Sequence, residues 1–79
     1  RNPSPVVIGL FKPGTDGRTI GHRIKLSAGQ FLAGQRIPAA LTSGGKVGFC
    51  FLFDDDQKSC PDRARAPAFF GELAVRKGP

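Results

Sequence analysis

The chain has 79 residues, of which 39% are hydrophobic, and it carries a net charge of +6 at neutral pH. This length predicts one small domain spanning residues 1–79, with an extended terminus over 1–5. No apolar run approaches the roughly 18 residues that would predict a membrane-spanning helix. Seven phenylalanines are the only aromatic residues, and their clustering favours one packed core.

The first two elements are predicted to form a β-hairpin. Residues 6–11 (VVIGLF) and 18–26 (RTIGHRIKL) are strand-like runs separated by KPGTDG. That segment holds two turn dipeptides whose glycines adopt positive φ without steric cost. In the second strand Arg23 and Lys25 alternate with apolar residues and are expected to face solvent. His22 falls on the apolar side, which is typical of a core or strand-edge histidine rather than a ligand.

The next stretch is broken by Gly34 and Pro38, which exclude a continuous helix. We expect a turn over 27–30, a short strand near Gln30–Leu32 and another around Pro38–Thr42. Thr42-Ser-Gly-Gly-Lys46 is predicted to be a hairpin turn. Residues 38–42 would then pair antiparallel with 46–53.

Residues Val47 to Cys60 (VGFCFLFDDDQKSC) contain the densest apolar run of the chain. Both faces of the strand 47–53 are apolar or small, which predicts a central strand covered on both sides. The run Asp54-Asp55-Asp56 is expected to be a solvated turn, because adjacent carboxylates are costly to bury. Cys50 and Cys60 are expected to form a disulfide that ties the end of this strand to the next segment.

After a proline-bounded loop, residues 68–77 (AFFGELAVRK) predict the closing strand. Five to six short strands separated by Gly/Pro turns indicate an all-β fold. The expected architecture is a small, single-domain antiparallel β-sandwich or barrel with one disulfide.

No catalytic or metal-binding constellation is predicted. The aspartate run lacks the alternating ligands, the glycine and the distal glutamate of an EF-hand. Cys50, Cys60 and His22 make only three zinc ligands, at a spacing unlike a zinc ribbon. The sole histidine has no nucleophile motif beside it. The sequence therefore predicts a protein that is not an enzyme and has no cofactor.

The basic charge suggests an anionic partner, although it is equally typical of a small protein kept soluble by its charge. A nucleic-acid-binding β-barrel is the first alternative function, but no RNA- or DNA-binding motif is present. The basic binding surface is predicted to comprise Arg18, Arg23, Lys25, Arg36, Lys46, Arg76 and Lys77.

Protein binding is the favoured function class, because small β domains expose edge strands to which a partner can add a strand. The candidate edges are the first and last strands, Val6–Phe11 and Phe69–Arg76. A structural subunit of a self-assembling complex is the second alternative.

A disulfide-compatible cysteine pair fits an oxidising compartment, so we expect a secreted protein. A chain that begins at Arg1 is typical of a processed mature chain or a trimmed one. In its size, basic charge, Cys50-Phe-Leu-Phe53, Cys60 and closing strand Glu72–Lys77, the chain resembles the MAX-type secreted β-sandwich effectors of plant-pathogenic fungi. The resemblance implies a non-enzymatic protein, delivered into host cells, that binds a host protein. It carries over no specific binding residue.

Overall fold

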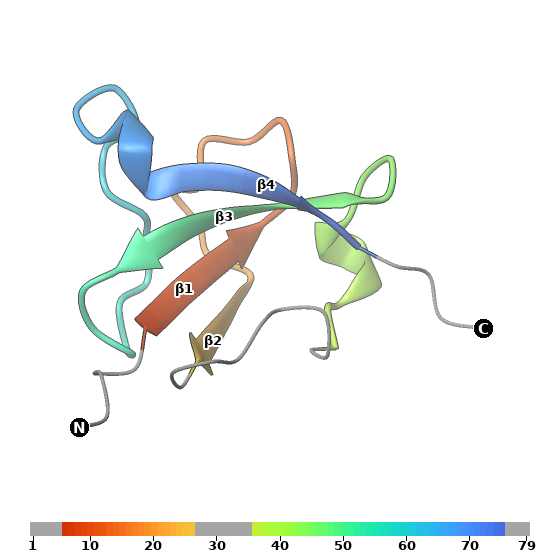
Figure 1. The fold of residues 1–79 in the computed structure, drawn as a ribbon, viewed down its shortest axis with the longest axis horizontal. Helices are drawn as coiled ribbons and strands as arrows, with labels where there is room; N and C mark the ends of the chain where they lie inside the picture. The colour runs from red at the N-terminus through yellow and green to blue at the C-terminus, as the bar shows by residue number, and fades with distance from the viewer. Residues whose placement is uncertain (1–5, 27–35, 76–79) are drawn as a thin grey trace.

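A computed structural model describes residues 6–26 and 36–75 of the chain. They form one antiparallel sheet in the order β2-β1-β3-β4 (Figure 1). The strands are β1 (Val6–Phe11), β2 (His22–Leu26), β3 (Lys46–Leu52) and β4 (Phe70–Ala74), and two short 3-10 turns are η2 (Ala39–Leu41) and η3 (Pro67–Phe69).

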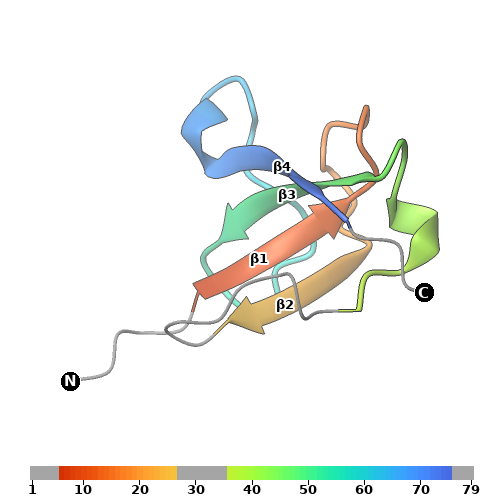
Figure 2. The ribbon, with the colours of Figure 1, turned by 45° about the vertical axis from the view of Figure 1, so that its right-hand side comes forward.

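The described residues form one open sheet, which is neither a closed barrel nor the two packed sheets of a sandwich, so the expectation of a barrel or sandwich is wrong for these residues. Strand β2 pairs only with β1, and β4 pairs only with β3, which leaves two edges that do not meet (Figure 2). Four strands form within residues 6–26 and 36–75, where five to six were expected for the whole chain. The all-β class, the antiparallel pairing and the β1–β2 hairpin are confirmed.

Strand β3 is central, as its two apolar faces predict. It lies between β1 and β4, and its alternate side chains enter two separate clusters. On one face, here called the aliphatic face, Ile8, Leu10, Ile24 and Val47 are buried together. On the other, the disulfide face, the buried residues are Phe11, Cys50 and Leu52.

Two glycines within the sheet stand directly opposite phenylalanines. Gly48 is the cross-strand partner of Phe11, and Gly71 is the partner of Phe49. A Cβ atom built on Gly48 would lie 2.5 Å from the Phe11 ring, and one on Gly71 would lie 2.6 Å from the Phe49 ring. Each ring therefore fills the space that its glycine leaves empty, and each pair brings aromatic surface close to the backbone.

The strand expected around Pro38–Thr42, and its pairing with 46–53, are wrong. Ala39–Leu41 form the turn η2, closed by the Leu41 amide donating to the Pro38 carbonyl at 2.9 Å. Pro38 has no amide hydrogen to give to a sheet ladder. Only Ser43 bridges to Lys46, across Gly44 and Gly45, which both have positive φ. The short strand expected near Gln30–Leu32 lies outside the described residues.

The second strand starts at His22 rather than at Arg18, because the preceding backbone is engaged elsewhere. The Arg18 amide donates to the Asp16 carboxylate at 3.0 Å, forming a local turn. The Ile20 amide donates to the carbonyl of Lys58 at 3.3 Å, on the loop that follows β3. The closing strand is likewise shorter than expected, because Pro67–Phe69 form η3 before β4 begins.

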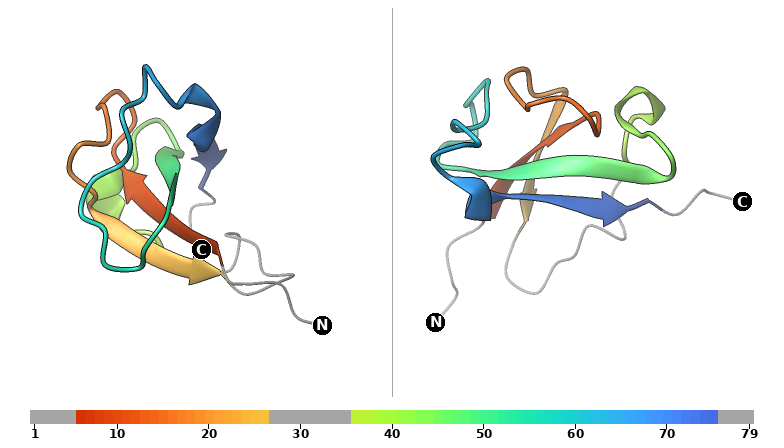
Figure 3. Two further views of the ribbon diagram at one scale, coloured as in Figure 1. Left: turned by 90° about the vertical axis from the view of Figure 1, so that its left-hand side faces the viewer. Right: turned by 90° about the horizontal axis from the view of Figure 1, so that it is seen from above.

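The predicted disulfide between Cys50 and Cys60 is present, with the two Cα atoms 6.0 Å apart. Cys60 also donates its amide to the carbonyl of Gly17 at 3.0 Å. Gly17 has a φ of 76°, and a side chain there would meet the Cys60 sulfur at 3.0 Å. The connection after β1 and the loop after β3 consequently lie together over the disulfide face (Figure 3).

Reducing the disulfide should lower the free energy of unfolding by about 2–3 kcal/mol, because the bridge closes a loop of about ten residues in the unfolded chain. Urea denaturation with and without reductant measures the difference. The double variant Cys50→Ala/Cys60→Ala is the control, and its denaturation midpoint should not respond to reductant. An unchanged midpoint for the wild-type chain on reduction would contradict the prediction.

Candidate protein-binding surfaces

Three phenylalanines gather at one end of the sheet and form what is here called the aromatic surface: Phe51, Phe53 and Phe69. The ring centroids of Phe51 and Phe69 are 6.4 Å apart, and those of Phe53 and Phe69 are 5.7 Å apart. Phe53 is 72% exposed and Phe51 is 40% exposed. Large contiguous exposed apolar groups are uncommon on a monomeric protein and indicate a contact surface.

The aromatic surface is built by the end of β3 and by η3. Phe51 shares the aliphatic face with Val47 and Phe49, since side chains alternate along a strand, and its ring packs edge-on against Phe49 at 5.7 Å. Phe53 follows the last residue of β3. The turn that follows the loop after β3 and precedes β4 lies at the same end of the sheet (Figure 2). This turn is η3, and Phe69 is its last residue.

The outer edge of β4 presents backbone groups without partners. The Val75 amide donates to the carbonyl of Gly45 at 2.8 Å, and the register continues with Leu73 opposite Val47. In an antiparallel pair the inward and outward backbone groups alternate. The backbone groups of Phe70, Glu72 and Ala74 therefore point away from β3. The Phe70 amide donates to the Pro67 carbonyl and so closes η3. No described backbone hydrogen bond reaches the amides of Glu72 and Ala74 or the carbonyls of the three residues.

The outer edge of the sheet at β2 differs, because the acidic turn folds back against this strand. The Lys25 ammonium lies 2.9 Å from the Asp55 carboxylate, and Arg23 donates from Nη1 to the Gln57 carbonyl at 3.2 Å. The acidic turn is thus exposed to solvent as predicted, and it also contacts both cationic side chains of β2, Arg23 and Lys25.

The pKa of Asp55 lies below its ordinary value of 3.8, chiefly because its carboxylate accepts a hydrogen bond from Lys25. The charges of Lys25 and, more weakly, Arg23 act in the same direction. Because the folded state favours the ionised form of Asp55, this carboxylate makes the stability of the domain depend on pH.

The structure brings only Arg23 and Lys25 together from the predicted basic surface. Arg18 pairs with Asp16 at 3.0 Å. Arg36 precedes η2, and by the strand register Lys46 lies at the opposite end of the sheet from Lys25. Arg76 and Lys77 lie outside the described residues. The basic surface stays a prediction.

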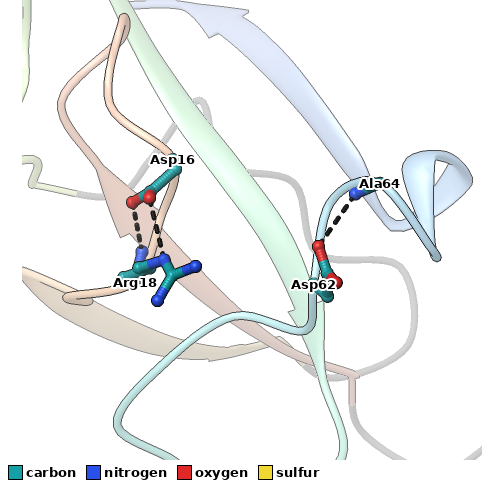
Figure 4. A network of polar contacts seen from close by, with 4 residues as sticks. All are labelled: Asp16, Arg18, Asp62 and Ala64. Carbon is teal, nitrogen blue, oxygen red and sulfur yellow. Dashed lines mark hydrogen bonds and ion pairs between the residues drawn. The ribbon is translucent and has the colours of Figure 1, made fainter.

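A shallow depression of about 530 Å³ lies between the connection after β1 and the segment 59–63. Its two carboxylates are held in local turns, as Figure 4 shows. Asp16 accepts from the backbone and side chain of Arg18, and Asp62 accepts from the Ala64 amide at 3.1 Å. Both carboxylates of the depression are therefore engaged in local turns.

His22 is exposed at the start of β2, opposite Leu10, and does not enter the core. Within residues 6–26 and 36–75, no three His, Cys, Asp or Glu side chains come together as metal ligands would. The same ranges contain no helix long and apolar enough to cross a membrane.

The sequence did not predict the aromatic surface, because a run with two apolar faces was interpreted as fully covered. One signal was available: Phe53 stands directly before three aspartates that were expected to form a solvated turn, so its ring is at the border of the covered strand. Comparison with family models, curated proteins and solved structures finds no match to this chain.

The Asp55→Asn variant should lose stability at neutral pH and lose progressively less as the pH falls. The lowered pKa means that ionised Asp55 stabilises the folded state above its ordinary pKa, and that this contribution disappears as the pH falls through the folded value. Urea denaturation at several pH values between about 2 and 7 measures the difference from wild type. In a Lys25→Gln background the pH-dependent difference should largely vanish, and its persistence there would contradict the role of the ion pair.

Proposed function

We propose that this chain is a non-enzymatic protein-binding domain that takes an extended segment of a partner protein as an added strand beside β4. One observation carries the proposal: the outward amides of Glu72 and Ala74, and the carbonyls of these residues and of Phe70, have no backbone partner in the described chain. An extended peptide satisfies such groups with a ladder of main-chain hydrogen bonds. Of the two predicted edges, β4 is an edge, whereas β1 is an interior strand.

The opposite edge, β2, is less suited to strand addition. Its alternate residues Arg23 and Lys25 are charged, and both contact the acidic turn. Charged side chains, especially lysine, are a common means by which proteins block pairing at an edge strand. The charge of β4 is limited to Glu72.

Side chains on each side of β4 would select the residues of an added strand. On the aliphatic face the Phe49 ring covers Gly71 and so reaches toward the edge, with Leu73 beside it. On the disulfide face Phe70 carries the guanidinium of Arg63 at 4.9 Å from its ring centroid. The added strand would therefore meet apolar groups at every second position on the aliphatic face and a cation on the other.

The disulfide supports the proposal that the protein is secreted, since such bridges persist in oxidising compartments. On the resemblance to MAX-type effectors, the partner would be a host protein. Nucleic-acid binding has weaker support, because the described cations do not interleave with the exposed phenylalanines as they do in single-strand-binding folds. Phe53 is followed by three aspartates, which repel phosphate.

The substitution Glu72→Pro should abolish strand addition while leaving the fold intact. The Glu72 amide points outward, so proline removes a donor needed by the partner and none needed by β3. Linear peptides selected from a random display library against the full chain provide the probe. Their affinity for wild type and variant is measured by calorimetry, after circular dichroism shows that the variant is folded.

The matched control is Glu72→Gln, which changes the charge and keeps the amide donor. It should retain binding to within about threefold, as expected for loss of an exposed charge. Binding that survives Glu72→Pro, or that is lost equally in both variants, would contradict strand addition. A second copy of the chain is the other possible occupant of this edge. Sedimentation would detect it as self-association that the peptides compete with.

A further inference from the structure

The aromatic surface is held in place before any ligand arrives. The Phe53 amide donates to Oε1 of Gln57 at 3.0 Å, and Nε2 of the same glutamine donates to the Ser59 carbonyl at 2.8 Å. Phe69 is fixed by the turn η3, and its ring touches both Phe51 and Phe53. A surface with this degree of order loses little conformational entropy on binding.

The acidic turn sits directly beside this surface. Asp54 and Asp56 follow Phe53, and no ion pair within the described ranges engages either of them. Asp55 alone has a cation, Lys25. Asp54 and Asp56 therefore leave two carboxylates at this corner that no ion pair of the described residues engages. Screening confines each field to about 8 Å at physiological ionic strength, so a ligand docked here responds to the local aspartates.

Aromatic ring faces attract cations, and more strongly when the cation is partly desolvated. The rings of Phe53 and Phe51 are exposed, and carboxylates next to them would hold the same cation by charge. Phosphate groups of a nucleic acid or an anionic membrane would instead be repelled by these carboxylates. The rings and carboxylates together therefore favour a cationic partner segment over one that carries phosphates.

We propose that the aromatic surface Phe51, Phe53 and Phe69, bordered by Asp54 and Asp56, binds an arginine- or lysine-containing segment of a partner protein. Cationic side chains lie against the phenylalanine rings, and their charge meets the aspartates. The surface is separate from the outer backbone groups of β4, so it does not depend on strand addition.

Short peptides of alternating serine and arginine test the proposal. They are titrated into the full, isotope-labelled chain and followed by amide chemical shifts, with serine–glutamate peptides as the charge control. The shifts should concentrate at Phe51, Phe53, Asp54 and Phe69. The variant Phe53→Ala should weaken binding about two- to fivefold, the range of an exposed cation–ring contact. Because Phe53 is 72% exposed, the variant should remain folded.

Two matched variants separate the contributions. Phe53→Leu keeps the apolar character and removes the ring, so it should weaken binding nearly as much as Phe53→Ala. Asp54→Asn should weaken binding about twofold, whereas Asp16→Asn removes the same charge away from the surface and should have no effect. Unchanged binding with Phe53→Leu would show that the surface takes apolar side chains and would overturn the proposal.

Preference for the glutamate peptide, or shifts at Phe51 and Phe53 caused by a single-stranded oligonucleotide or phosphatidylserine vesicles, would also overturn it. No binding of the arginine peptide at any site would do the same. Glu72→Pro should leave arginine-peptide binding intact. This variant therefore distinguishes failure of the cation-binding surface from failure of strand addition at β4.

Discussion

The central strand of this domain has apolar side chains on both faces, and the described residues build no second sheet over either face. This constraint determines the rest of the structure. One four-stranded sheet forms, and its two faces are covered by connections between strands. The disulfide face receives the connection after β1 and the loop after β3, joined by hydrogen bonds between Gly17 and Cys60 and between Ile20 and Lys58. The bridge to Cys50 holds that cover in place.

The aliphatic face is covered unevenly along the central strand. Val47 is buried among Ile8, Leu10 and Ile24, with Ile37 and Leu41 packed against them. Coverage decreases toward the end of β3, where Phe51 and then Phe53 become exposed. The binding surfaces proposed above arise at this end and at the neighbouring edge, where the short chain has nothing left in the described ranges to place over them.

Local sequence features predicted the parts of the fold that depend on local chemistry. The positive φ of Gly14 and Gly17, the antiparallel pairing of the first two strands and the Cys50–Cys60 bridge all follow from residues close in sequence. The edge position of β4 was among the predictions, but that of β1 was wrong, because strand order depends on which distant segments meet. The hairpin turn after Thr42 predicts a strand over residues 38–42, whereas Ala39–Leu41 form η2 after Pro38, which has no amide hydrogen for a ladder.

The sites were harder to predict than the fold, because exposure is a property of the whole molecule. Arg23 and Lys25 were placed on the solvent side of β2, and both are exposed. Nothing in their spacing indicates that Asp55 and Gln57 come back to meet them. Phe49 and Phe51 are two residues apart on one face, yet one is half-buried and the other is exposed, since only Phe49 faces a glycine on the neighbouring strand.

The two side-chain hydrogen bonds of Gln57 connect Phe53 to the loop that the disulfide closes, so the redox state of the compartment affects this corner. The Gln57 side chain fixes Phe53, and Gln57 itself lies inside the loop that the disulfide closes. In a thiol-rich compartment the Cys50–Cys60 disulfide is reduced, and the loop between the two cysteines then gains conformational freedom. The Gln57 side chain would then hold the Phe53 backbone, and with it the Phe53 ring, in a less fixed position. Ligand affinity at this corner would accordingly follow the redox potential of the surroundings, although neither cysteine belongs to the contact surface.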